Sequence, residues 1–446
     1  MLKDMTKGSP MRHIFTFAIP MLIGNIFQQL YNMVDSIVVG RFVGPNALAA
    51  VGTSFPVIML IISMVIGLTA GGGIIISQLY GAKEMEKLKR AISTAFIFQL
   101  IAGIIITFMG LTLSGWLLTK LNVPPEVFDD SLTYIRIFFA GLLTMFAYNI
   151  YSGVLRSLGD SKTPLYFLIV STVVNIVLDI LFVARYGWGV AGVAWATVIA
   201  QGVSTVLSVI YVYAKVPLLA LKPKDFIFDK ELFFTMIRLG IPSSIQQSLA
   251  SLGIIAVQGL VNSFGAVTMA AYTAAGRLDS FANMPSMNIA MSVSTFTGQN
   301  LGAGKTERVK EGLVAALKIM AVFSIFMSAL IFMFGPNMIT IFIDSSETEV
   351  IRQGVEYMKT VSIFYPVFGI LLIFNNLLRG AGDTKIPMFT TLFNLGVRVV
   401  AAYYLASTSL GYRGIWISLP VGWCVGSLVP VTRYFSGKWK TKAVTS

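Results

Sequence analysis

Residues 151–164 read YSGVLRSLGDSKTP, and residues 374–387 read FNNLLRGAGDTKIP. The two segments share the pattern L-R-x-x-G-D-x-K-x-P, 223 residues apart. In each copy the glycine suits a left-handed helix end, and the arginine suits the negative end of that helix. The proline suits the first turn of the next helix. The pattern therefore predicts a structural turn between two helices, used twice, rather than a loop that contacts a ligand.

A second pair of segments supports the repeat. Ile19-Pro20 recurs as Ile241-Pro242, 222 residues further along the chain. Self-similarity at a constant offset indicates two copies of one structural unit. Both prolines fall inside long apolar runs, where proline removes one backbone hydrogen bond and permits a kink.

The composition is that of a membrane protein. Of the 446 residues, 56% are hydrophobic and only 12% are charged, and the mean hydropathy is +0.79. A soluble domain carries about 25% charged residues. The net charge of +13 does not indicate nucleic-acid binding, because no basic run with interleaved aromatic residues stands on a soluble domain. A single cysteine, Cys424, and a single histidine, His13, exclude a disulfide framework and a zinc cluster of these residues.

Twelve runs are long enough to cross a bilayer, which takes about 20 apolar residues. They are approximately 14–40, 51–79, 91–118, 131–155, 164–184 and 190–214, followed by 236–262, 269–298, 312–334, 354–378, 387–407 and 414–435. Six runs separate the two copies of each repeated segment, so both copies have the same membrane orientation. This predicts an all-α polytopic fold of two pseudo-symmetric six-helix bundles, with an N-terminal lobe at 1–214, a linker at 215–235 and a C-terminal lobe at 236–446.

The loops also predict an orientation. The loops on the side of the N-terminus hold most of the lysine and arginine residues, as in Lys83, Lys87, Arg308 and Lys310. Cytoplasmic loops of membrane proteins are enriched in these residues. Both termini are therefore expected in the cytoplasm.

A polar face lies in the first apolar run. Asn25, Gln28, Asn32 and Asp35 are spaced by three or four residues, which places them on one side of a helix. A carboxylate at membrane depth is costly, so it normally faces a protein interior or a water-filled cavity and has a function there.

A second acid stands on the fifth run. Asn175 and Asp179 are four residues apart, and Thr197 and Tyr134 stand on neighbouring runs. Carboxylate, amide and hydroxyl oxygens suit a hard cation such as Na⁺, and the same carboxylates could instead carry a proton. The polar faces that continue from these acids supply the candidate substrate contacts, which are Gln28, Asn32, Tyr148, Ser152 and Gln201.

With the paired turns, the twelve spans and VDSIVVG at Val34–Gly40, the chain resembles the multidrug and toxic compound extrusion (MATE) family. It is most similar to prokaryotic members that keep their ionisable network in the N-terminal lobe. The resemblance implies Asp35 as the acid of helix one, Asn175, Asp179 and Thr197 as its cation network, and Tyr134 as the associated tyrosine. Asp35, Asn175, Asp179 and Thr197 would be metal ligands only if Na⁺ is the coupling ion.

The C-terminal lobe departs from one pattern of the family. Some members carry a glutamate on helix seven and an aspartate on helix ten, whereas residues 246–255 and 365–374 here contain no acid. A carboxylate cation site at those positions is therefore not expected. Arg277 and Asp279 interrupt helix eight. They form either a compensated pair or part of a water-filled vestibule, and local charge satisfaction is the preferred interpretation.

The resemblance implies a secondary active antiporter that exports amphipathic, often cationic compounds in exchange for H⁺ or Na⁺. It would act as a monomer in a bacterial or archaeal cytoplasmic membrane, with no organic cofactor. Protonation of Asp35 is expected to change the bend at Pro20 and reshape the cavity of the first lobe.

Three other functions remain open from the sequence. A flippase for lipid-linked oligosaccharides belongs to the related superfamily, and a wide cationic cavity would favour it. An intramembrane enzyme could use Asp35 and Asp179 as a carboxylate pair, although no nucleophile with a histidine accompanies them. A membrane scaffold would have no need of the buried acids.

Overall fold

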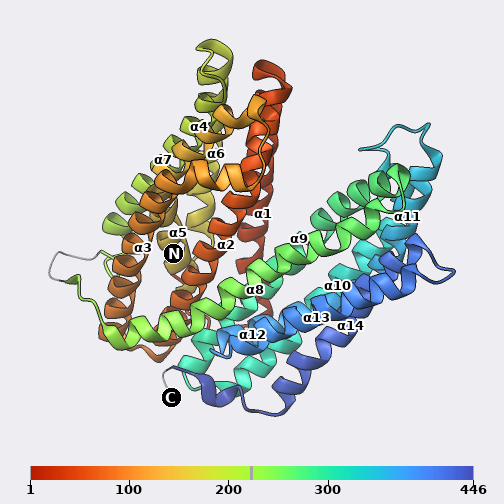
Figure 1. The fold of residues 1–446 in the computed structure, drawn as a ribbon. Coiled ribbons are helices and arrows are strands. Elements are labelled where there is room, and N and C mark those ends of the chain that lie inside the picture. The colour runs from red at the N-terminus through yellow and green to blue at the C-terminus, as the bar shows by residue number, and fades with distance from the viewer. Residues whose placement is uncertain (1, 221–224, 445–446) are drawn as a thin grey trace. The chain divides into compact units, whose positions relative to one another are not determined.

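The computed structural model describes residues 2–220 and 225–444, apart from the side chains of residues 60, 250–252 and 254. Residues 221–224 of the expected linker lie outside this part of the chain. The helices are α1 (Pro10–Val38), α2 (Pro45–Ala82), α3 (Met85–Lys120), α4 (Pro125–Ala140), α5 (Leu142–Ser157), α6 (Lys162–Asp179), α7 (Gly189–Lys215), α8 (Lys230–Asn262), α9 (Ala266–Gly302), α10 (Thr306–Ile339), α11 (Thr348–Ser362), α12 (Tyr365–Gly380), α13 (Lys385–Ala406) and α14 (Tyr412–Phe435) (Figure 1). The described residues also form the π-helical segments η1 (Val39–Val43) and η2 (Ile180–Arg185) and the 3₁₀ segment η4 (Lys440–Lys442).

The twelve expected spans correspond to these helices, and the all-α polytopic fold is confirmed. Within the described residues, eight helices are long and apolar enough to cross a membrane, or ten when each of two bent pairs counts as one span. The bent pairs are α4 with α5, at 47°, and α11 with α12, at 52°. The other two spans, α8 and α9, have 33 and 37 residues but carry more polar side chains, among them Gln258, Arg277 and Asp279.

The contacts divide the chain into two compact units, and each is described here by itself. The first contains residues up to Lys3, Pro20–Tyr80 and Glu84–Ser244. Within it α7 packs against α4, α5 and α6, and α3 packs against α4 and α5. Its core around α4 and α5 includes Phe139, Leu142 and Phe146, each at most 2% exposed.

The second unit contains Asp4–Ile19, Gly81–Lys83 and Ile245–Ser446. Here α9 packs against α10, α11 and α12, while α13 lies alongside α14 (Figure 1). Trp416 is 1% exposed at the centre of the core. Its ring stacks on Tyr272 at 5.6 Å between centroids and meets Tyr357 edge-on at 5.2 Å. Trp416 thereby fixes the first turns of α14 against Tyr272 of α9 and Tyr357 of α11.

The boundary between the units crosses two helices close to their prolines. In α1 it falls between Ile19 and Pro20, and in α8 it falls after Ser244, two residues beyond Pro242. Compared with the lobes expected from the repeat, Asp4–Ile19 and Gly81–Lys83 belong to the second unit, and the start of α8 belongs to the first. The lobe boundaries at 1–214 and 236–446 therefore stay a prediction.

The repeated turns have the structural role that the sequence predicts. Gly159 and Gly382 adopt φ of +85° and +91°, the left-handed region that favours glycine. Arg156 and Arg379 stand in the last turns of α5 and α12. After the first turn, Asp160 accepts hydrogen bonds from the backbone of residues 162 and 163 at 3.1 and 3.0 Å, so it caps the start of α6.

Candidate functional site

Two widened helical turns lie next to the acids of the first unit. Beyond α1, the backbone N–H of Gly44 bonds to the carbonyl of Val39, five residues back. Beyond α6, Tyr186 bonds in the same way to Leu181. Such π-helical turns are uncommon and are frequent at functional sites. The two turns pack against each other, so Asp179, the last residue of α6, is brought towards α1.

A cluster of valines holds this contact together. Val38, Val39, Val183, Val190 and Val193 are buried and pack on one another. Val38 and Val39 of the sequence VDSIVVG therefore join the end of α1 and η1 to η2 and α7. Val34 and Tyr134 pack against the edge of the cluster, which places the tyrosine of α4 beside the acid-bearing end of α1.

The carboxyl groups of Asp35 and Asp179 face each other, with the amide of Asn175 beside Asp35. Asn175 and Asp179 are 0% exposed. The Oδ1 atom of Asp35, both oxygens of Asp179 and both amide atoms of Asn175 are buried without a hydrogen-bond partner among the described residues. Buried polar atoms without partners are costly. These carboxylate oxygens of the two acids and the amide oxygen of Asn175 are thus hydrogen-bond acceptors left without a donor among the described residues, while Nδ2 of Asn175 is an unpartnered donor.

Thr197 and Tyr134 complete the surroundings of the acid pair. The hydroxyl of Tyr31 donates a hydrogen bond of 2.9 Å to Oγ1 of Thr197. The Tyr31 and Tyr134 side chains both lie within electrostatic range of Asp35 and Asp179. The structure thus brings together all five residues of the expected cation network, which come from α1, α4, α6 and α7.

Tyr31 is the member that the sequence analysis missed. It stands four residues before Asp35, and this spacing places the two on one helix face. The signal was therefore present in the sequence, but an aromatic residue in an apolar run is ordinarily assigned to packing. The π-helical turns, in contrast, have no comparable signal in the residue pattern.

The five expected substrate contacts lie in different surroundings. Gln28 and Asn32 are exposed on α1. Tyr148 is buried and donates a 3.2 Å hydrogen bond to the carbonyl of Pro164. The hydroxyl of Ser152 and the amide oxygen Oε1 of Gln201 are buried without partners among the described residues.

In the second unit, Asp279 does not pair with Arg277, and the expected local pair is corrected. Oδ1 of Asp279 accepts hydrogen bonds from Tyr365 at 2.8 Å and from Asn283 at 3.0 Å. The cation whose charge acts on Asp279 is Arg398 of α13. The guanidinium of Arg277 instead lies 6.0 Å from the centre of the Phe342 ring. The two side chains stand only two positions apart on α9, so they point in different directions around the helix.

Long apolar helices in two compact units are typical of a polytopic membrane transporter. A family model, MatE, matches the chain twice, over residues 20–181 and 242–404. The chain belongs to this family, the multidrug and toxic compound extrusion transporters that the sequence resembles, and it is a transporter rather than an enzyme. The double match coincides with the repeat seen in the sequence.

Three similar proteins illustrate the range of the family. The probable multidrug resistance protein YoeA of Bacillus subtilis (strain 168) is 33% identical, over 99% of this chain and 96% of its own. A protein of Shewanella oneidensis that is named FAD transporter is 23% identical, over 92% and 91%. A crystal structure of a MATE protein in the bent conformation has a TM-score of 0.90 and 27% identity, over 99% and 98%.

Proposed function

We propose that this transporter is a multidrug efflux antiporter that exports amphipathic, often cationic compounds in exchange for inward-moving H⁺ or Na⁺. The coupling ion binds at Asp35 and Asp179 in the first lobe. The observation that carries the proposal is the pair of facing carboxyl groups with unpartnered oxygens. Relatives named as multidrug resistance proteins support the export of drug-like molecules.

The acid pair couples the ion through elementary electrostatics. Two facing carboxylates in a poorly solvated site repel each other, and one bound cation removes the repulsion. A proton does this by sitting on one carboxyl group. Na⁺ does it through oxygen ligands, and the amide oxygen of Asn175 and the hydroxyl of Thr197 add neutral oxygens to the set. The donor set therefore fits either ion, and no organic cofactor is needed.

Pro20 gives α1 a place to change shape. It lies 15 positions before Asp35, or roughly 22 Å along the helix axis, and interrupts the backbone hydrogen bonding there. Loading of Asp35 changes the bend at Pro20 and thereby reshapes the cavity of this lobe. The bent conformation of a related MATE protein supports such a motion. Spin labels placed on α1 on either side of Pro20 should move when the pH changes, and an unchanged distance would contradict this step.

The substrate meets the polar groups that continue from the acids, namely Gln28, Asn32, Tyr148, Ser152 and Gln201. The unpartnered atoms of Ser152 and Gln201 support this assignment. The name of the Shewanella relative, FAD transporter, shows that membership of the family does not fix the substrate. Transport of a drug-like cation by this chain therefore has to be measured directly.

The protein is expected to lie in a prokaryotic cytoplasmic membrane as a monomer with both termini in the cytoplasm. Lys83 and Lys305, in the turns between α2 and α3 and between α9 and α10, support this orientation together with the basic residues in the first turns of α3 and α10. Single cysteines introduced into these turns after replacement of Cys424 should react with impermeant reagents only from the cytoplasmic side.

The test is efflux of a fluorescent cationic dye from proteoliposomes, with the H⁺ and Na⁺ gradients imposed separately. One of the two gradients should drive transport by the wild-type protein. Asp35→Asn should abolish the driven transport while the protein still inserts and purifies. Asp129→Asn removes an exposed acid of α4 and serves as the control, with transport near the wild-type rate.

Two results would overturn the proposal. Gradient-driven transport by Asp35→Asn at the wild-type rate would remove the coupling role of the acid pair. A wild-type protein that moves no dye under either gradient, but moves lipid-linked oligosaccharide without one, would favour the flippase function instead.

A further inference from the structure

The second unit contains a cavity of about 560 Å³ that the acid pair does not touch. It is lined by side chains of α8, α9, α11, α12, α13 and α14, all from residues 245–446. The volume lies within the range of small-molecule sites in proteins. Three charged side chains line it, namely Arg277, Asp279 and Arg398, so their formal charges leave one positive charge in excess.

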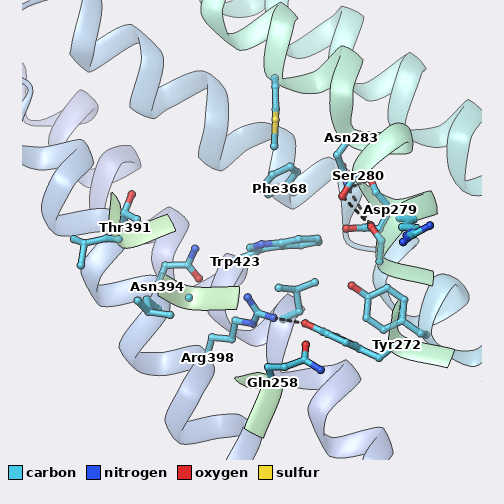
Figure 2. Close-up of a pocket in the computed structure, with 18 of the residues that line it drawn as sticks. Gln258, Tyr272, Asp279, Ser280, Asn283, Phe368, Thr391, Asn394, Arg398 and Trp423 are labelled. Atoms are coloured by element: carbon cyan, nitrogen blue, oxygen red, sulfur yellow. Dashed lines mark hydrogen bonds between the residues drawn. The ribbon is translucent and has the colours of Figure 1, made fainter. Parts of the chain in front are cut away.

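Arg398 is fixed in place with part of its hydrogen-bonding capacity unused. Its Nη2 donates to the hydroxyl of Tyr272 at 3.2 Å (Figure 2). Tyr272 is itself held by the stack on Trp416. The Nε of Arg398 is buried and has no partner among the described residues. A rigid guanidinium with a free N–H is suited to an anionic acceptor, since arginine binds carboxylates and phosphates through parallel N–H donors.

Asp279 does not neutralise Arg398 by direct contact. No ion pair within 4.0 Å joins them in the described structure, and Oδ1 of Asp279 is engaged by Tyr365 and Asn283. Figure 2 shows Asp279 on the α9 side of the cavity, next to Asn283, while Arg398 points towards Tyr272. The guanidinium therefore has hydrogen-bonding capacity that Asp279 does not use.

The rest of the cavity favours a flat ring. Trp423 and Phe368 lie with their centroids 4.5 Å apart and their planes inclined by 31°. Figure 2 shows the indole of Trp423 extending into the middle of the cavity. Asn394 also lines the cavity. An aromatic face prefers an offset-stacked or edge-on ring.

We propose that this cavity binds planar aromatic molecules that carry an acid group, with the acid on Arg398 and the ring against Trp423. The site is separate from the acid pair of the first lobe and does not depend on the coupling proposed there. Its chemistry is the reverse of that pair, because the group that selects the ligand is a cation. One transporter thus holds a site for a cation in one lobe and a site for an organic acid in the other.

The test uses three probes that share a naphthalene ring and differ in charge: naphthalene-1-acetate, naphthalene-1-acetamide and 1-naphthylmethylammonium. Each is equilibrated by dialysis against the full-length protein in nanodiscs of uncharged lipid, and retention by empty nanodiscs is subtracted. We expect the acetate to bind about tenfold more tightly than the amide, as for a hydrogen bond to a charged group. R398Q should remove this difference, and W423A should weaken all three probes.

Arg413→Gln provides the matched control, because it removes an exposed arginine outside the cavity and should leave the binding of all three probes unchanged. Equal binding of the three probes to the wild-type protein overturns the proposal, and this measurement needs no variant to fold. An R398Q protein that purifies as a single species and still prefers the acetate overturns it as well. So does a W423A protein with unchanged affinity.

Discussion

The hydroxyl of Tyr31 donates a hydrogen bond of 2.9 Å to Thr197 and so connects α1 to α7 beside the acid pair. Tyr31 stands one helical turn before Asp35, which means that this contact restricts the position of the acid itself. Thr197 therefore has two possible roles, as an oxygen ligand and as an anchor for α1. A variant of each partner separates them.

Tyr31→Phe and Thr197→Val each remove one end of this hydrogen bond. Each change should cost on the order of 1 kcal/mol in the stability of the loaded site, so the concentration of Na⁺ or H⁺ needed for half-maximal transport should shift about fivefold. The double variant should cost little more than either single change, since the second has no contact left to break. Dye efflux from proteoliposomes across a range of ion concentrations measures all three. Tyr186→Phe, at an exposed ring, is the control, and strictly additive effects would show that the contact has no energetic role.

Asp179→Asn should raise stability and abolish driven transport together. An amide next to Asp35 removes the repulsion between two carboxylates and needs no cation to balance it. Sites of this kind commonly reduce stability for the sake of function. The purified variant should unfold at a temperature a few degrees higher than the wild-type protein near pH 8. A lower unfolding temperature with intact transport would show that the pair serves the fold instead.

Gly159→Ala should destabilise the protein because residue 159 adopts a left-handed backbone. Its φ is +85°, and a Cβ there would come within clashing distance of the carbonyl oxygen of Lys3. The backbone conformation alone costs an alanine about 1–2 kcal/mol. Gly259→Ala is the matched control, since that glycine lies inside α8 with open space around it and alanine favours helices. Thermal unfolding should place the first variant below the wild-type protein and the second at or above it.

Arg308 holds the N-terminal segment onto the turn between α9 and α10. It donates to the carbonyls of Met5 at 3.2 Å and Gly8 at 2.8 Å, and Met5 is 0% exposed. Arg308→Gln should therefore release this segment. Amide hydrogen exchange over residues 4–8 should accelerate at least tenfold, with exchange in α13 unchanged. Unaltered protection would show that the backbone contacts of Met5 are sufficient.

Asp4 makes the same segment sensitive to acid. Burial raises its pKa, but hydrogen bonds from the side chain and backbone of Thr6, at 2.6 and 2.9 Å, outweigh burial and lower the pKa below its ordinary value. A lowered pKa contributes stability above the unfolded value, near pH 4, and this stability is lost as the pH falls through the folded value. Asp4→Asn should unfold at a lower temperature than the wild-type protein at pH 7, and the difference should shrink below pH 4. A constant difference would exclude ionisation of Asp4 as its cause.

The sequence predicts much of the fold and of the first site because both follow local patterns. Apolar length defines the spans, the glycine and proline of the repeated turn define helix ends, and a spacing of four residues places Asn175 and Asp179 on one face. Contacts between distant helices do not follow such patterns. Asp279 is close to Arg277 in sequence, yet it bonds to Tyr365, 86 positions away, because the helix face it occupies is set by packing against α12. For the same reason the cavity around Arg398 could not be predicted from the residue order.

The repeated turns also bear on how such a transporter could arise. Gly159 and Gly382 control where α5 and α12 end, at the turns that lead into α6 and α13. After a duplication of the ancestral half, selection on these turns alone would preserve the architecture, while the side chains inside each copy were free to diverge. The first copy could then acquire the facing acids Asp35 and Asp179, and the second copy could acquire Arg398 in its cavity, without loss of the shared fold.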